Sequence, residues 1–294
     1  MAKAIPILPD EQARGLLAGY DAAVAAKRNR LIVGLLIVCV LTLLSARMAE
    51  VKPATFIENF GNFTNYIYAI LPTIRAESIG PDLAEWFWGW RKWLALLGET
   101  VLIAYLGTLV GAIGAFLLCF CASANLVSSR VVQFCARRFL EFCRTVPEIV
   151  FALIFVIAFG LGPVVGVLAL AIHTTGALGK LFAEIVENID MKPVEGLNAT
   201  GASWVQTIRF AVVPQVLAGF TSYTLLRFEI NVRGAGVMGF VGAGGIGMEF
   251  LSAIRNFYYS DVSAILLLLI VTVTTIDLLT EQLRHRLTSS EGRH

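Results

Sequence analysis

Apolar stretches long enough to cross a bilayer constrain the fold of this chain more than any other feature. A spanning helix needs about 20 mainly apolar residues, because the hydrocarbon core is about 30 Å thick and each helical residue rises about 1.5 Å. Such stretches lie near residues 31–49, 94–122, 139–160, 163–187, 211–234 and 262–283. Only 15% of the residues are charged, against about 25% in soluble domains. The sequence therefore predicts an all-α integral membrane protein with about six transmembrane helices.

Lysine and arginine residues gather beside three of these stretches. They stand before the first stretch, before the third and after the last, as Lys27, Arg28, Arg30, Arg130, Arg137, Arg138, Arg144, Arg284 and Arg286. Because basic residues collect on the cytoplasmic side of membrane proteins, we expect both ends of the chain in the cytoplasm. Six spans then place residues 123–138 and 188–210 in the cytoplasm, and residues 50–93 and 235–261 outside.

These positions divide the chain into five segments. They are a cytoplasmic N-terminal segment (1–30), a leading transmembrane helix (31–49), an external aromatic-rich segment (50–93), a main membrane domain (94–283) and a cytoplasmic tail (284–294). The aromatic residues of the external segment are Phe56, Phe60, Phe63, Tyr66, Tyr68, Trp86, Trp88, Trp90 and Trp93. Two interpretations stay open for them: a belt of rings at the membrane–water boundary, or a docking surface for a soluble partner.

Several other classes of protein are excluded. The net charge is +2 and the basic residues are dispersed, which argues against nucleic acid as a partner. The five cysteines form no C-x-x-C pair and have no histidine at ligand spacing, so we expect neither a disulfide framework nor a metal site. No Ala-x-Ala cleavage site follows the first apolar stretch, which we expect to remain as an anchor.

The loop between the fourth and fifth stretches has an internal order of its own. Asp190 can cap a helix, Pro193 suits a first helical turn, and Glu195 follows near the positive end of the helix dipole. Gly201 then permits a tight turn or close approach to another surface. Apolar residues follow at helical spacing, at Trp204, Val205 and Ile208, before Val213-Pro214 opens the next span. We expect a short helix, a bend, and an amphipathic second helix on the inner face of the membrane.

This loop resembles the E-A-A, three residues, G, nine residues, I-x-L-P motif of the type I ABC importer permeases. Glu195, Gly201 and Pro214 agree with the motif. Gly196 and Leu197 stand where alanines are usual. Further blocks resemble the phosphonate-importer permeases, and they are Ala199-Thr200-Gly201-Ala202, Phe228 to Arg233, Val241 to Gly247, Leu161-Gly162-Pro163, Gly166 to Leu170 and His173-Thr174. The resemblance covers residues 95 to 283, and Gly234-Ala235-Gly236 departs from the Ala-Thr-Val expected there.

The resemblance implies a permease fold with a cytoplasmic coupling helix in the bacterial inner membrane. Two permease chains, identical or paralogous, would form the pathway for phosphonate or a related phosphorus oxyanion such as phosphate or phosphite. Two cytoplasmic ATPases would bind ATP and Mg, and an external protein would deliver the substrate. The ATPase-coupling loop would depend on Glu195, Gly201, Ala202 and Pro214. The chain has no G-x-x-x-x-G-K-[ST], so we expect no catalytic residue and no cofactor in it.

The glycine block between Gly242 and Gly247 also satisfies the G-x-G-x-x-G of dinucleotide-binding folds. Its context argues against that function, because a charged membrane span precedes it and no βαβ unit surrounds it. We expect Gly242, Gly244, Gly245 and Gly247 to let the chain turn at an external gate.

Three charged residues fall within the fifth apolar stretch. A charge at the bilayer centre costs about 2.5–3.5 kcal/mol on insertion scales, so Arg227, Glu229 and Arg233 should face protein or water. Glu229 and Arg233 have the spacing of a helical ion pair, whereas the free guanidinium of Arg227 suits a phosphorus oxyanion. An anion pathway lined by Arg227 or Arg233 and a structural ion-pair network both stay open. His173 can change charge near neutral pH, although we favour a satisfied core histidine.

Two other functions compete with import driven by ATP. An ion-coupled secondary transporter of a small anion would use Glu229, Arg233 and His173, but the two halves of the chain show no inverted repeat. A membrane enzyme acting on phosphorylated lipid would need clustered Asp, Glu or His at a membrane face. The chain has only three histidines, two of them near its C-terminus.

Overall fold

The computed structural model describes residues 10–291, and every regular element within them is a helix. Contacts divide the chain into two compact units, Met1–Tyr66 and Ile67–His294. Four helices are long and apolar enough to cross a membrane, and two bent helix pairs bring the number to six if each pair is one span. The all-α fold with about six spans is thereby confirmed for the described residues.

In the first unit, helix α1 (Asp10–Met48) runs unbroken from the basic segment into the first apolar stretch. The boundary expected near residue 30 therefore falls inside a continuous helix. The Ala, Leu, Arg and Lys residues around it favour helix, so polarity changes there without a change of backbone conformation. Residues 1–9 of the expected N-terminal segment lie outside the described residues.

Helices α2 (Pro53–Ile70) and α3 (Ile79–Trp86) occupy the segment expected to be aromatic-rich and external. No residue of α2 is buried, and the rings of Phe56, Phe60 and Phe63 follow one another along it at centroid distances of 5.9 and 6.3 Å. Before α3, the Arg75 backbone N–H donates to the carboxylate of Asp82 and holds the pKa of that carboxyl below its ordinary value.

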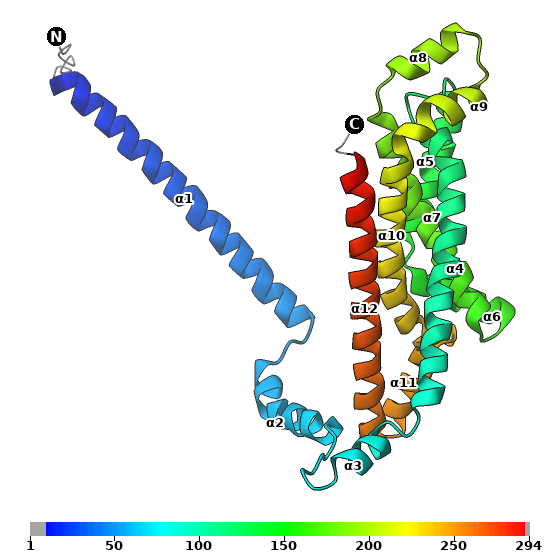
Figure 1. Ribbon diagram of the computed structural model, residues 1–294. Coiled ribbons are helices and arrows are strands. Elements are labelled where there is room, and N and C mark those ends of the chain that lie inside the picture. Colours follow the sequence, from blue (N-terminus) through cyan, green and yellow to red (C-terminus); the bar gives the residue numbers. More distant parts are fainter. Residues whose placement is uncertain (1–9, 292–294) are drawn as a thin grey trace, which may run out of the picture. The chain divides into compact units, whose positions relative to one another are not determined.

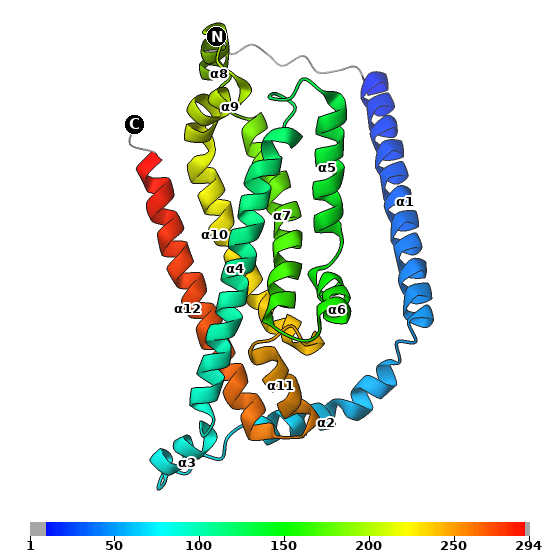
Figure 2. The same ribbon diagram turned by 90° about the vertical axis from the view of Figure 1, so that its right-hand side faces the viewer.

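Four long helices form the bundle of the second unit. They are α4 (Trp90–Ala122), α7 (Pro163–Glu187), α10 (Val213–Met238) and α12 (Tyr259–Glu291), and they lie side by side in Figures 1 and 2. The most extensive contact joins α4 and α7. Helix α12 continues beyond residue 283, where the tail was expected to begin, and residues 292–294 lie outside the described part of the chain.

Three clusters of buried apolar side chains follow one another along this bundle. The first contains the stacked rings of Phe182 and Phe220, with centroids 3.9 Å apart, and the second contains Leu170. The third contains Trp93, which is 1% exposed, together with Ile246. Trp93 therefore belongs to the core of the bundle and is not one of its exposed rings.

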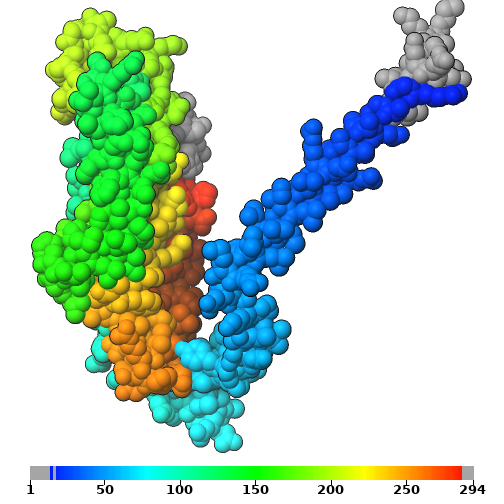
Figure 3. Space-filling view, turned by 180° about the vertical axis from the view of Figure 1, so that it is seen from behind, coloured from blue at the N-terminus to red at the C-terminus, as the bar shows by residue number. Residues whose placement is uncertain are grey.

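The third predicted span is two helices. Helix α5 (Arg130–Thr145) and helix α6 (Glu148–Phe159) meet at an angle of 85° across Val146-Pro147. The prediction of one continuous helix is wrong because proline restrains the residue before it and cannot donate a helical hydrogen bond. Helix α6 stands out from the side of the bundle in Figures 1 and 3. The break predicted at Gly160 to Pro163 is confirmed, since α6 ends before it and α7 begins at Pro163.

The segment 235–261, which we expect outside the membrane, is mostly helical. Helix α10 continues to Met238, a short 3-10 turn (η2, Gly239–Val241) follows, and α11 (Ile246–Arg255) then leaves at an angle of 49°. Helix α11 contacts α12, α4 and α10, so most of this segment packs into the bundle.

Two tryptophans expected at the membrane boundary have specific partners in the same unit. The indole Nε1 of Trp86 donates to Ser263, and that of Trp88 donates to the carboxylate of Asp261, at 3.0 and 2.9 Å. These bonds tie the segment around α3 to the first turns of α12.

Candidate functional site

The loop 188–210 lies at one end of the bundle, where Figure 1 shows α8 and α9 beyond the ends of the long helices. Helix α8 (Lys192–Ala199) ends in a turn at Gly201, and α9 (Trp204–Thr207) follows. Gly201 has a φ of 81°, and no atom would lie within 4 Å of an added Cβ. Glu195 and Gly201 are exposed and Ala202 is half-buried. The predicted short helix and bend are both present, and the bend requires glycine for its backbone conformation.

The predicted second helix differs from our expectation. Helix α9 passes through one π-helical turn, η1 (Ile208–Val212), directly into α10, so the loop and the span share one continuous helical path. Pro214 accounts for the wider turn, because proline cannot donate the regular helical hydrogen bond and its ring crowds the turn before it. Of the predicted apolar stripe, Ile208 is buried in the bundle, whereas Trp204 and Val205 are exposed on its surface.

Side chains that the sequence pattern did not single out hold this loop on the bundle. The amide of Gln215 accepts from the Asp190 backbone N–H at 3.1 Å and donates to the Asp190 carbonyl at 3.2 Å. Val194 of α8 is 2% exposed and packs in the first core cluster. Thr207 donates to Asn198 at 3.0 Å across the bend. The sequence signal that could have indicated this anchoring was Gln215, a lone amide directly after the proline of an apolar stretch.

A charged cluster forms where the broken third span meets α7 and α10. The His173 ring places Nδ1 3.1 Å from the Val146 carbonyl oxygen and Nε2 3.7 Å from a carboxylate oxygen of Glu148. Arg227 of α10 lies within electrostatic range of both His173 and Glu148. An added Cβ at Gly234 would lie 3.5 Å from the Glu148 carboxylate, so that carboxylate lies against α10. The structure thus brings Arg227 and His173 together and adds Glu148, which sequence reasoning missed.

Behind this cluster, a buried polar contact joins three helices. The Asn231 side chain, 1% exposed, donates to the hydroxyl of Thr108 at 2.8 Å and to that of Thr174 at 2.9 Å. Arg227 Nε lies 3.5 Å from the same Thr174 hydroxyl. The carbonyl oxygen of Asn231 is buried and has no hydrogen-bond partner. A polar contact at this depth fixes the rotation of α10 against α4 and α7.

The predicted ion pair between Glu229 and Arg233 does not form. Arg233 pairs with Asp277 of α12 at 2.8 Å, and Glu229, which is 7% exposed, accepts a hydrogen bond from Thr280 of α12. Helix α12 runs antiparallel to α10. Glu229 and Arg233 each find a partner on α12, instead of pairing with each other one turn apart on α10. These two residues therefore tie α10 to α12, on a different side of α10 from Arg227.

The glycine block closes a tight turn between η2 and α11. Three of its glycines have left-handed backbone conformations, with φ values of 89°, 85° and 74° at Gly242, Gly244 and Gly245. The fourth, Gly247, lies so close to α10 that an added Cβ would be 2.0 Å from the Gly236 carbonyl oxygen. All four are buried, and packing leaves no room for a side chain at any of them, while at Gly242, Gly244 and Gly245 the backbone conformation also favours glycine.

Two residues of α4 bind the backbone of this turn. The Glu99 carboxylate accepts from the Gly245 N–H at 3.2 Å, and the Thr100 hydroxyl accepts from the Ile246 N–H at 2.9 Å. The Gly242 carbonyl accepts from the Gly162 N–H at 3.0 Å, which joins the turn to the start of α7. The glycine block is therefore a fixed junction of α4, α7 and α11.

Comparison with known proteins gives a consistent result. Residues 114–289 match the family described as "Binding-protein-dependent transport system inner membrane component". The phosphite transport system permease protein PtxC of Stutzerimonas stutzeri is 39% identical over 214 residues, which are 73% of this chain and 76% of that protein. The phosphate-import permease protein PhnE of Mycolicibacterium smegmatis is 40% identical over 186 residues, which are 63% of this chain and 35% of that protein.

Among solved structures, the fold is similar to that of a chain of the MetNI methionine ABC transporter in an inward-facing conformation. The TM-score is 0.57 at 16% sequence identity, and the match covers 66% of this chain and 95% of that chain. The resemblance of the fold to a type I importer permease, expected from the sequence, is confirmed.

Proposed function

This chain belongs to the binding-protein-dependent transport system inner membrane components, and we propose that it is the permease subunit of an ATP-driven importer of phosphorus oxyanions. Phosphonate, phosphite and phosphate form the substrate class. The names of its relatives PtxC and PhnE, a phosphite permease and a phosphate-import permease, support that class. We assign ATP and Mg to two separate cytoplasmic ATPases, a second permease chain to the other half of the pathway, and delivery to an external binding protein.

The loop 188–210 carries this proposal, and we now call it the coupling loop. It projects from the end of the bundle with Glu195 and Gly201 exposed, while Val194 and Gln215 hold it rigidly to the helices behind it. A loop that is exposed but firmly anchored can receive a force from a partner and pass it to α10. We assign Glu195, Gly201, Ala202 and Pro214 to the ATPase contact, and we propose a cytoplasmic location for both chain ends from the distribution of basic residues.

For the substrate pathway, we assign Arg227 with His173 and Glu148. A guanidinium presents paired N–H donors that match the oxygens of a phosphonate or phosphate. Arg227 has no ion-pair partner within 4 Å among the described residues, whereas Arg233 is engaged by Asp277. Glu229 and Arg233 are then structural ties. We place the outer gate at Gly242, Gly244, Gly245 and Gly247. The turn that they form joins α4, α7 and α11 toward the end of the bundle opposite the coupling loop.

The experiment that tests this proposal is uptake into proteoliposomes that contain this chain, its candidate ATPase and its candidate binding protein. Phosphite uptake should require ATP and should persist when ionophores collapse the ion gradients. Uptake that stops with the gradients while ATP stays high would favour an ion-coupled transporter and overturn the proposal.

Two glycine variants test the coupling loop within the same assay. Gly201→Glu should lower uptake by about tenfold or more, a loss of about 1.4 kcal/mol, because the new side chain strains the turn and adds a charge at the contact. Gly196→Ala is the matched control, since Gly196 is also exposed with nothing within 4 Å but has helical backbone conformation. Equal uptake in the two variants would show that Gly201 does not contribute to the ATPase contact.

A further inference from the structure

A second cytoplasmic segment, residues 122–126 at the end of α4, is bonded to both sides of the coupling loop. The Asn125 side chain donates to the Val186 carbonyl at 2.8 Å, just before the loop begins. The Leu126 carbonyl accepts from the Trp204 indole at 3.0 Å, just after the bend. The segment therefore spans the base of the coupling loop as a brace.

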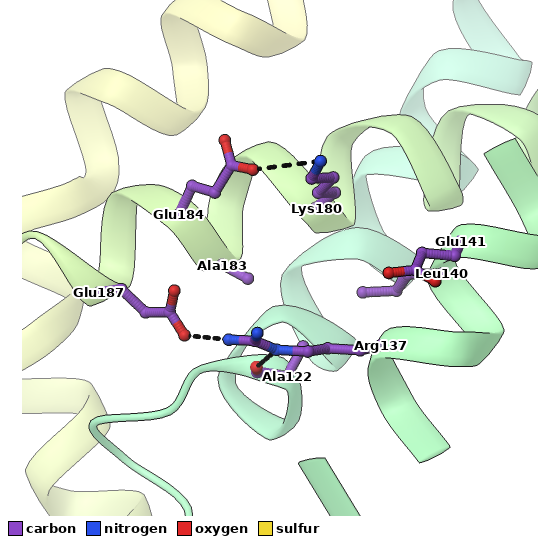
Figure 4. Close-up of a pocket in the computed structure, with 8 residues that line it drawn as sticks. All are labelled: Ala122, Arg137, Leu140, Glu141, Lys180, Ala183, Glu184 and Glu187. Carbon is purple, nitrogen blue, oxygen red and sulfur yellow. Dashed lines mark hydrogen bonds and ion pairs between the residues drawn. The ribbon is translucent and has the colours of Figure 1, made fainter. Parts of the chain in front are cut away.

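One arginine and one glutamate fasten this brace to two further helices. Arg137 of α5 pairs with Glu187, the last residue of α7, and its Nε donates to the Ala122 carbonyl at 2.8 Å. The same Glu187 carboxylate oxygen accepts from the Ala124 N–H at 2.6 Å. Figure 4 shows Arg137 reaching from α5 toward both the Glu187 carboxylate and the Ala122 carbonyl. We call Arg137 and Glu187 the clasp.

Beyond the clasp, α5 and α7 are in direct backbone contact. An added Cβ at Gly176 would lie 2.5 Å from the Arg144 backbone nitrogen and 2.6 Å from the Leu140 carbonyl oxygen. Small residues permit such an approach. We expect two helices packed this closely to move as one body. The contact ends where His173 meets the Val146 carbonyl, at the break beside Glu148. The clasp and the charged cluster thus lie at opposite ends of one helix pair.

We propose that the clasp locks α5 and the 122–126 segment to the coupling loop, so that movement of the coupling loop reaches the broken span at Val146-Pro147. Arg137 and Glu187 are positioning residues in this account, because neither touches the substrate. The proposal depends on the ATP-driven function proposed above.

We expect the clasp to contribute little to the free energy of unfolding. The side chains of Arg137 and Glu187 are 41% and 28% exposed, and ion pairs of that exposure are weak in folded proteins. Its effect should therefore appear in coupling, through the bonds that it makes to Ala122 and Ala124. The direct measure of transmission between the two sites is the coupling of import to ATP hydrolysis.

The test measures substrate molecules imported per ATP hydrolysed, in proteoliposomes with the full transporter. Arg137→Gln and Glu187→Gln should each lower this ratio by about fivefold or more, the lower end of known coupling strengths. The double variant should be no worse than either single variant, because both changes break the same link. A loss of folded protein alone would lower import and ATP hydrolysis together and leave the ratio unchanged.

Two further variants provide the controls. Arg138→Gln removes a neighbouring cation whose pair with Glu141 is confined to α5, and the ratio should stay at the wild-type value. Arg137→Lys keeps the charge but has one donor nitrogen in place of the separate Nε and Nη2 that reach Ala122 and Glu187, so the ratio should fall between those of wild type and Arg137→Gln. Three results would each contradict the proposed role of the clasp. They are an unchanged ratio in Arg137→Gln, a loss in the double variant equal to the sum of the two single losses, and a loss in Arg138→Gln as large as that in Arg137→Gln.

Should the clasp variants fail to assemble, the wild-type complex still decides the question. Hydrogen exchange in residues 122–126 should change with that in the coupling loop when ATP binds, and a change in the loop alone would overturn the clasp. A wild-type complex that imports nothing with ATP would instead remove the proposed function. The two failures are thereby distinguishable.

Discussion

Arg227 and Arg233 lie within two turns of each other on α10, yet they occupy different surroundings. Arg227 turns toward α7 and the broken span, where His173, Glu148 and a threonine hydroxyl lie near it. Arg233 is 53% exposed and is held by Asp277. The cost of an intramembrane charge is thus met in two ways: Arg227 lies in a cluster that leaves its charge available, and Arg233 lies in a pair that engages its charge.

The largest expected effect is on the available charge. Arg227→Gln should lower oxyanion uptake by about 100-fold, as removal of one preorganised donor does in other sites, while the complex still assembles. The measurement is initial uptake with ATPase content determined on the same vesicles. Arg233→Gln/Asp277→Asn is the matched control and should keep most of the uptake; a reversed order would exchange the roles of the two arginines.

The next effect concerns stability. Arg233→Gln alone should lower the midpoint of thermal unfolding, because the Asp277 carboxylate loses its partner and its second oxygen is already buried without one. Since both side chains are partly exposed, we expect a loss of about 1–2 kcal/mol. Adding Asp277→Asn should recover most of it. Failure of the double variant to recover would contradict a simple tie between α10 and α12.

A smaller effect separates charge from hydrogen bonding at Glu229. Glu229→Gln keeps an oxygen that accepts from Thr280, so uptake should stay within about twofold of wild type. Thr280→Val, which instead leaves the buried carboxylate without its donor, is the comparison and should lower stability more than Glu229→Gln does. If Glu229→Gln instead abolished ATP-driven uptake, its charge would belong to the transport cycle.

The smallest effect is expected at Lys180 and Glu184, which form an exposed pair within α7 at 3.5 Å. Lys180→Gln should change uptake and the unfolding midpoint by no more than the scatter of the assay, because such pairs contribute about 0–1 kcal/mol. A fall of the unfolding midpoint as large as that of Arg233→Gln would show that the exposed fraction of the two side chains does not predict how much such an ion pair contributes to stability.

Much of this fold could be predicted from local signals. Apolar length gave the spans, the Gly160 to Pro163 break was visible in the sequence, and Gly201 marked the bend. The break at Val146-Pro147 was also accessible, because proline in an apolar stretch favours the end of a helix. That signal was outweighed by the continuous hydropathy on both sides of it.

The candidate site could be predicted only in part, because it depends on how helices face one another. The spacing rule within one helix paired Glu229 with Arg233, but α12 provides a partner for each. Glu148 meets His173 only because α6 bends away from α5, and no local pattern contains that angle. Rotation and register between helices are set by packing along their whole length.

The most direct test of the account is substrate-stimulated ATP hydrolysis by the complete transporter, with wild type and Arg227→Gln measured together. Phosphite, phosphate and an alkylphosphonate would be compared with sulfate, an oxyanion of similar shape. We predict that a phosphorus oxyanion stimulates the wild-type complex more than sulfate does, and that Arg227→Gln keeps the basal rate without stimulation. A wild-type complex indifferent to all three, or equal stimulation of the variant, would contradict the account.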